Sequence, residues 1–165
     1  MRSSGIAFFS PDAGYTTQLI RTSSKEPEGL RLSHIFNEFN RVVKDKSIEM
    51  ACMEGPSYHS VNKSFSMGAA YGIYKLVCAQ QGIPLTIVPP TKIKKYATGK
   101  GHASKVDIIR SCTELFSSDN LSDDEADALA CCSIAREIAS DKVLNLPKTR
   151  AALEVIMSIK PSLLG

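Results

Sequence analysis

Two short apolar runs, each stopped by proline, constrain the fold of this 165-residue chain more than any other feature. Residues 48–53 (IEMACM) end at a Glu-Gly-Pro sequence, and residues 84–88 (PLTIV) end at two prolines. Each run has the length of a buried strand, and glycine and proline stop regular structure. The segment between them, from about residue 61 to 81, has a helical pattern that ends at a glycine. This order predicts parallel strands joined by a helix.

The remaining patterns predict a hairpin and further helices. Residues 5–9 and 15–22 flank the turn formers Ser10-Pro11-Asp12-Ala13-Gly14, which is typical of a β-hairpin. We expect an α/β fold with a mixed sheet covered by helices, in one domain with its core at about 1–140 and a C-terminal helical tail at 143–165. Helical spacing or capping signals occupy four other segments: 30–43, 104–116, 122–138 and 149–159.

The composition excludes some classes of protein. A formal charge of +3 is too small to identify a nucleic-acid partner. The five cysteines form no C-x-x-C pair, which indicates free thiols in a reducing compartment and no zinc site of that type. The apolar stretches are broken before they could cross a bilayer, and the N-terminal apolar run is too short for a secretory signal. We therefore expect a cytoplasmic protein with no membrane partner.

Carboxylates at two places are candidates for metal binding. Glu54 ends a predicted strand, and ligands collect at the carboxyl ends of parallel strands. Asp124 and Asp127 are three residues apart on one predicted helix face, so both could point at a cation beside a strand end. The helix dipole alone explains Asp123 and Glu125, and the latter also belongs to an S-x-x-E capping box. Asp127 is flanked by apolar residues, where an unpartnered carboxylate is costly to bury.

A basic segment separates these carboxylates along the chain. We interpret residues 91–103 as a polar loop containing Gly99 and Gly101 that suits a phosphate backbone, with a solvated basic loop as the alternative. Lys105 opens a predicted helix, where the dipole disfavours cations, so its position indicates a specific anionic contact. No acidic residue interrupts the five lysines: Lys92, Lys94, Lys95, Lys100 and Lys105.

Three motifs together resemble the RuvC resolvases over about the first 140 residues. These motifs are Glu54 with its loop and small-residue helix, the Thr98-Gly99-Lys100-Gly101 segment, and Asp124-x-x-Asp127-Ala-Leu-Ala. The resemblance implies a ribonuclease H-like fold. It also implies an endonuclease that resolves four-way (Holliday) DNA junctions with two Mg²⁺ ions per site, or with Mn²⁺.

The resemblance also implies roles for particular residues. Glu54, Asp124 and Asp127 would bind the metal ions and act in catalysis. Lys105, also catalytic, and Lys94 would approach the scissile phosphate, with the other lysines of the basic segment binding DNA. The loop after Glu54, including Tyr58, would enter the junction. The helix 61–81 would form a homodimer interface through Gly68 and Gly72, although packing on the sheet of the same subunit explains those glycines equally well.

One departure from the family pattern concerns the first catalytic aspartate. In the family it lies on the opening, central strand, just before the stretch that Arg2–Gly5 resembles, so that strand would lie before Met1. Asp12 falls in the hairpin turn and does not replace it. We expect Met1 to be an internal methionine of a protein with roughly ten further residues, including an aspartate. Two alternatives stay open: a junction-binding protein that does not cut, and another ribonuclease H-like protein such as a nucleotide-binding one.

Overall fold

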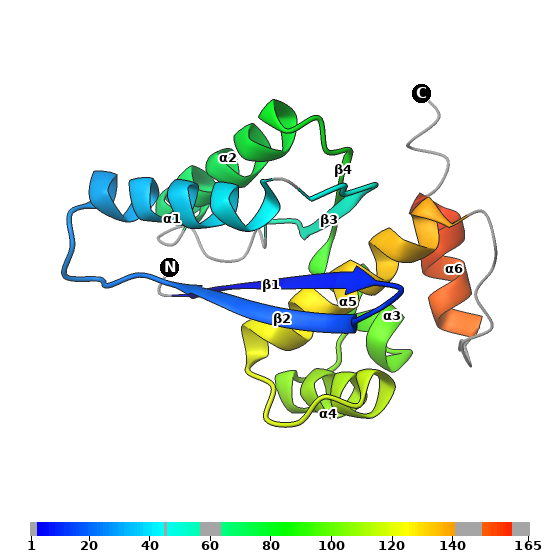
Figure 1. Ribbon diagram of the computed structural model, residues 1–165. Helices are drawn as coiled ribbons and strands as arrows, with labels where there is room; N and C mark the ends of the chain where they lie inside the picture. The colour runs from blue at the N-terminus through cyan, green and yellow to red at the C-terminus, as the bar shows by residue number, and fades with distance from the viewer. Residues whose placement is uncertain (1–2, 45, 57–63, 141–149, 160–165) are drawn as a thin grey trace.

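The computed structural model describes residues 3–44, 46–56, 64–140 and 150–159 (Figure 1). The predicted hairpin, strands and helices are confirmed, with boundaries shifted by a few residues. In chain order the elements are β1 (Ser3–Ser10), β2 (Gly14–Arg21), α1 (Glu28–Val43), β3 (Ala51–Glu54), α2 (Ser64–Gln80), β4 (Leu85–Val88), α3 (Pro90–Thr98), α4 (Lys105–Phe116), α5 (Asp123–Ala139) and α6 (Arg150–Ile159).

The hairpin is closed by its turn residues. Strands β1 and β2 are antiparallel, with Ser3 opposite Arg21 at one end and Ser10 opposite Gly14 at the other. The Ala13 N–H donates to the Ser10 hydroxyl oxygen at 3.1 Å, and Gly14 has a φ of 68°, a conformation that glycine adopts without steric cost. The turn chemistry read from the sequence therefore fixes the register of the hairpin.

The second strand pair, β3 and β4, is parallel and places the partly buried Glu54 at the C-terminal end of β3. Glu54 is opposite Val88, the last residue of β4. The Ala51 N–H donates to the Pro84 carbonyl at 2.8 Å, and the Gly55 N–H donates to the Val88 carbonyl at 2.7 Å. Proline then stops β4, since it has no N–H for a further ladder bond.

The two strand pairs are not hydrogen-bonded to each other in the described part of the chain. The prediction of a mixed α/β arrangement holds, but the strands form two pairs instead of one continuous sheet. Helix α5 packs on both β1 and β3 and bridges the two pairs (Figure 1). Helices α1 and α2 pack against each other on the opposite side of the hairpin from α5.

The interpretation of residues 91–103 as a loop was wrong for most of that segment. Helix α3 occupies Pro90–Thr98, with proline in its first turn, where the missing N–H has no cost. Ile93, Tyr96 and Ala97 are buried at helical spacing, and Gly99 ends the helix in the left-handed conformation. The lysines lie between these buried apolar positions, so the segment is an amphipathic helix.

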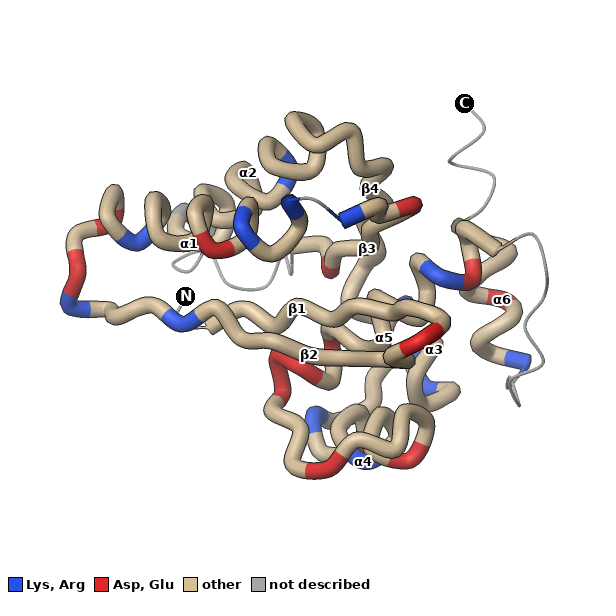
Figure 2. The backbone as a smooth tube through the Cα atoms, in the orientation of Figure 1, with Lys and Arg blue, Asp and Glu red and all other residues tan. Residues whose placement is uncertain are grey.

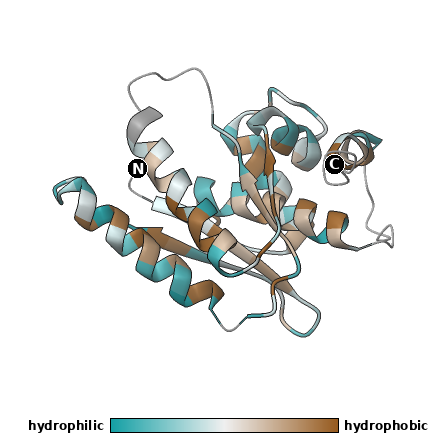
Figure 3. Cartoon of the chain, turned by 90° about the horizontal axis from the view of Figure 1, so that it is seen from above, coloured by the Kyte–Doolittle hydropathy of each residue, from teal (hydrophilic) through white to brown (hydrophobic). Residues whose placement is uncertain are grey.

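The core consists of separate clusters on the two sides of the molecule. Helices α3 to α6 contribute the largest cluster, which includes Ile93, Ile134 and Ile156. Two smaller clusters join α1 and α2 to the strands. In Figure 3 the ribbon of α1 alternates between hydrophobic and hydrophilic colours, as expected for a helix with one apolar face. None of the helices described is long and apolar enough to span a membrane.

Candidate active site

The three predicted carboxylates line a single cavity of about 1660 Å³ between the two strand pairs, hereafter the inter-sheet cavity. Glu54 reaches it from the end of β3, and Asp124 and Asp127 reach it from the first turns of α5. Lys105, the first residue of α4, lines the same cavity. Because α5 packs on β3, residues separated by some seventy positions in sequence come together.

Burial and neighbouring charges raise the pKa values of Glu54 and Asp127. Burial and, after it, the charge of Asp127 raise the pKa of Glu54 to about 7, with Asp124 adding to the rise and Lys94 and Lys105 opposing it. Burial also raises the pKa of Asp127, again against Lys105 and Lys94. Such effects need charges within a few ångströms of each other. Near neutral pH, Glu54 is therefore partly protonated, and a nearby cation would favour its ionised form.

A capping box fixes the start of α5, from which both aspartates project. The Glu125 N–H donates to the Ser122 hydroxyl oxygen at 3.3 Å, and the Ser122 N–H donates to the Glu125 carboxylate at 3.0 Å. The Thr17 hydroxyl of β2 donates to the same carboxylate at 3.0 Å, and the Ser3 hydroxyl of β1 donates to Asp124. Figure 2 shows this acidic stretch beside the hairpin. The hairpin thus holds the helix end that carries the aspartates.

The predicted lysines divide into different environments. Lys94 and Lys105 lower the pKa values of Glu54 and Asp127, so both face the site. Lys94 also donates to the Ala103 carbonyl at 3.1 Å, and Lys105 forms an ion pair with Asp123. Lys95 instead pairs with Glu154 of α6 at 2.8 Å, while Lys92 is half-exposed and Lys100 exposed.

The donor chemistry at the site fits a hard cation such as Mg²⁺, which prefers carboxylate oxygens. Within the described ranges, however, no group of three or more histidine, cysteine, aspartate or glutamate side chains is arranged to hold a metal ion. Asp124 accepts the Ser3 hydroxyl, and Asp123 is paired with Lys105. The carboxylates share one cavity without forming a finished coordination sphere.

Sequence reasoning missed three side chains at the site. One residue that it named, Tyr58, lies outside the described residues and is not placed. Ser3 and Thr17 lie on the hairpin, and only its packing on α5 reveals their bonds to Asp124 and Glu125. Tyr71 of α2 lines the cavity, and burial, followed by the charge of Glu54, raises its pKa. Its position in the small-residue strip of α2 was the available signal.

Comparisons with known proteins decide the family. The family model described as Crossover junction endodeoxyribonuclease RuvC matches residues 13–135. This chain belongs to the RuvC family. The RuvC of Pseudothermotoga lettingae is 34% identical over 67% of this chain and 70% of that protein. The RuvC of Synechococcus sp. (strain WH7803) is 30% identical over 68% of this chain and 74% of that protein.

Solved RuvC structures share the fold. The Thermus thermophilus RuvC structure matches with a TM-score of 0.64 at 20% identity, covering 79% of this chain and 83% of that one. T. thermophilus RuvC in complex with Holliday junction substrate matches with a TM-score of 0.65 at 21% identity, covering 78% and 81%. The fold expected from the resemblance, that of the ribonuclease H-like RuvC proteins, is thereby confirmed.

Proposed function

We propose that this RuvC-family chain is a Holliday-junction resolvase, an endonuclease that hydrolyses phosphodiester bonds in four-way DNA junctions. The observation that carries the proposal is the meeting of Glu54, Asp124 and Asp127 beside Lys94 and Lys105 in a chain of this family. Carboxylates beside lysines suit phosphodiester hydrolysis, in which negative charge builds on the phosphate. A solved relative, the T. thermophilus RuvC, is described in complex with Holliday junction substrate.

The carboxylates of this site would hold Mg²⁺, two ions in the complete site, with Mn²⁺ as a substitute. The metal would activate water and neutralise charge on the phosphate. Glu54 contributes a carboxyl whose pKa of about 7 lets it ionise when a cation approaches. Lys105 would exchange its ion pair with Asp123 for one with a DNA phosphate. Lys94 of α3, which is positioned by its hydrogen bond to the Ala103 carbonyl, would contact the same phosphate.

The junction would be bound by cations around this site and by two copies of the chain. Lys92 and Lys100 are available on α3 and just after it, and each phosphate contact releases counterions. Lys95 would bind DNA only after breaking its ion pair with Glu154.

Tyr58 would enter the junction. A homodimer through α2 would give two related sites for two symmetric cuts. The cytoplasm, where the chromosome of a bacterial cell lies, is the proposed location.

The test is cleavage of a labelled synthetic four-way junction, in Mg²⁺ and in EDTA, with a linear duplex of the same sequence as the control. We expect paired, symmetric nicks in the junction in Mg²⁺ alone. Junction binding without cleavage in Mg²⁺ or Mn²⁺ would favour the non-catalytic alternative. Absence of both binding and cleavage would contradict both functions.

A further inference from the structure

Helix α3 supplies Lys94 to the site, but it is too short to hold its own position. It has nine residues, fewer than an isolated helix needs to be stable in water. Its place therefore depends on packing against α4, α5 and α6. The aspartates Asp124 and Asp127 project from α5 instead. The distance between Lys94 and these carboxylates is therefore set by the way α3 packs on α5.

One buried tyrosine joins the two helices. Tyr96 of α3 is 8% exposed, and its hydroxyl lies 2.7 Å from the Ser133 hydroxyl oxygen and donates to the Glu137 carboxylate at 3.2 Å. Ser133 and Glu137 are one helical turn apart on α5 and are 1% and 6% exposed, so they form one buried polar patch. The other buried residues of α3, Ile93 and Ala97, are apolar. Tyr96 is therefore the residue through which the buried face of α3 reaches this patch.

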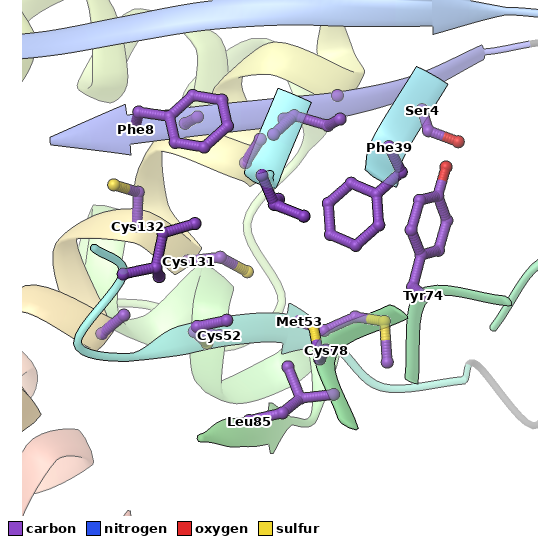
Figure 4. Close-up of a pocket in the computed structure, with 18 of the residues that line it drawn as sticks. Ser4, Phe8, Phe39, Cys52, Met53, Tyr74, Cys78, Leu85, Cys131 and Cys132 are labelled. Atoms are coloured by element: carbon purple, nitrogen blue, oxygen red, sulfur yellow. The ribbon is translucent and has the colours of Figure 1, made fainter. Parts of the chain in front are cut away.

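Helix α5 carries the patch and the aspartates on different faces. In Figure 4, Cys131 and Cys132 of α5 lie around the inter-sheet cavity, which Asp127 also lines. Ser133 follows them and does not line the cavity, because each residue of a helix is turned by about 100° from the one before. It lies about 9 Å further along the helix axis than Asp127. One continuous helix thus holds both the proposed metal ligands and the anchor of α3.

The polar groups around Tyr96 form a hydrogen-bonded chain with one direction. The Arg136 guanidinium donates to the Tyr15 hydroxyl oxygen at 3.2 Å, and the Tyr15 hydroxyl donates to Ser133 at 3.3 Å. Because Tyr96 gives its one proton to Glu137, the Ser133 hydroxyl donates to Tyr96. Each hydroxyl therefore accepts one bond and donates one. The chain joins β2, α5 and α3, and bonds in such a row strengthen one another.

Lys94 lies on the other side of α3 from Tyr96. Residues two apart on a helix are turned by about 200°, so any rotation of α3 that Tyr96 prevents would also move Lys94. The Lys94 amine donates to the Ala103 carbonyl at 3.1 Å, and its charge lowers the pKa values of the raised Glu54 and Asp127 carboxyls. The bond to Ala103 orients the end of the side chain, and Tyr96 fixes the helix from which the side chain extends.

We propose that Tyr96 is a positioning residue, whose hydroxyl sets the rotation of α3 on α5 and so holds Lys94 beside Asp127. Tyr96 does not touch DNA and acts through Lys94. Without the hydroxyl, Ser133 and Glu137 lose a buried hydrogen-bond partner, which is costly, so α3 repacks. The consequence for cleavage rests on the proposed nuclease function, whereas the placement of Lys94 rests on the packing of α3 alone.

The first test measures the placement of Lys94 without DNA. Tyr96→Phe removes the hydroxyl and keeps the ring. Reductive methylation with formaldehyde and a borohydride, followed by peptide mass spectrometry, gives the rate at which each lysine is labelled. We expect Lys94 to be labelled about threefold faster in Tyr96→Phe, since α3 opens or turns. Lys25, at an exposed position before α1, should be labelled at an unchanged rate.

Two further variants control for loss of stability. Ile134→Val removes one methyl group from a fully buried side chain of α5 and leaves every hydroxyl in place, so labelling of Lys94 should not change. Ser133→Ala breaks the chain from the α5 side without altering α3, and it should speed labelling of Lys94. This second variant also carries the test if Tyr96→Phe does not fold.

The second test asks whether Tyr96 acts through Lys94. Single-turnover cleavage of a synthetic four-way junction in Mg²⁺ is measured for Tyr96→Phe, Lys94→Ala and the double variant, at saturating protein. Tyr96→Phe should cut about tenfold more slowly, because a small displacement of a group at the phosphate is enough to slow the reaction. In the Lys94→Ala background the same change should slow cleavage by less than about twofold.

Three results would overturn the proposal. In the first, Lys94 is labelled at the same rate in Tyr96→Phe and Ser133→Ala as in the unmodified chain. In the second, Ile134→Val speeds labelling as much as they do, which means that any loss of stability frees Lys94. In the third, Tyr96→Phe slows cleavage equally in both backgrounds. If the unmodified chain does not cut the junction but Tyr96→Phe exposes Lys94 to labelling, the proposed function fails and the placement of Lys94 by Tyr96 is supported.

Discussion

Gly5 of β1 lies against the backbone carbonyl of Asp124, where a side-chain carbon on residue 5 would overlap the first turn of α5. This approach of strand and helix brings Ser3 within hydrogen-bonding distance of Asp124. We predict that Gly5→Ala lowers the free energy of unfolding by about 1–3 kcal/mol, because β1 or α5 must shift. Chemical denaturation measures the loss. Gly29→Ala on α1, where an added carbon would meet nothing, is the control and should leave stability unchanged or raised.

Substitution of Asp127 separates cutting from binding. Asp127→Asn removes one of the proposed metal ligands, so junction cleavage in Mg²⁺ should fall by about a hundredfold or more. Binding measured in EDTA should be retained, since the substitution removes a negative charge. Asp119→Asn, at an exposed acidic position that does not line the cavity, is the control. Retained cleavage in Asp127→Asn would remove this residue from the proposed active site.

The raised pKa of Glu54 predicts a pH-dependent stability. Its folded-state pKa is about 7, above the ordinary value of 4.5, so the folded state holds this proton more tightly than the unfolded state. The contribution of Glu54 is therefore fully present below about pH 4.5 and is lost as pH rises through about 7. In metal-free buffer, Glu54→Gln should lose less stability than the unmodified chain between pH 5 and pH 8.5, by on the order of 1–3 kcal/mol. Equal pH profiles for both proteins would contradict the prediction; Glu114→Gln, on the exposed surface of α4, is the control.

Lys105 should contribute one phosphate contact. Lys105→Ala is expected to weaken junction binding in EDTA and to reduce the slope of log affinity against log salt by about one. Fluorescence anisotropy at several salt concentrations measures the slope. Lys25→Ala, at an exposed position before α1, should leave the slope unchanged. An unaltered slope for Lys105→Ala would mean that the lysine stays paired with Asp123.

Helix α6 is proposed to belong to the same domain as the rest of the chain. Ile156 is buried in the core cluster that α6 shares with α3, and Lys95 bridges to Glu154 beside it. Ile156→Ala should cost about 2–4 kcal/mol in one cooperative unfolding transition. Met157→Ala, 73% exposed on the same helix, should cost little. A separate early transition in Ile156→Ala would make α6 an independent unit.

Local patterns determined the elements. Turn formers between β-rich runs specify the hairpin, proline stops β4, and the Ser122 and Glu125 pair starts α5, because each signal acts within a few residues of backbone. Residues 90–98 are the exception. Their apolar positions are spaced as in a helix, but the lysines and glycines of the segment suggested a loop, and only packing against α4 and α6 shows that one face of the segment is apolar and buried.

The sequence by itself pointed to Glu54, Asp124 and Asp127 as site candidates, from strand end, helix spacing and family motif, and the structure brings all three to one cavity. Only the tertiary structure decided the raised pKa values of Glu54 and Asp127, the separation of Lys94 and Lys105 from Lys95, and the presence of a cavity between two unjoined strand pairs. The reason is physical. Burial, electrostatic coupling and strand pairing depend on distances between segments far apart in the chain, and no local pattern encodes those distances.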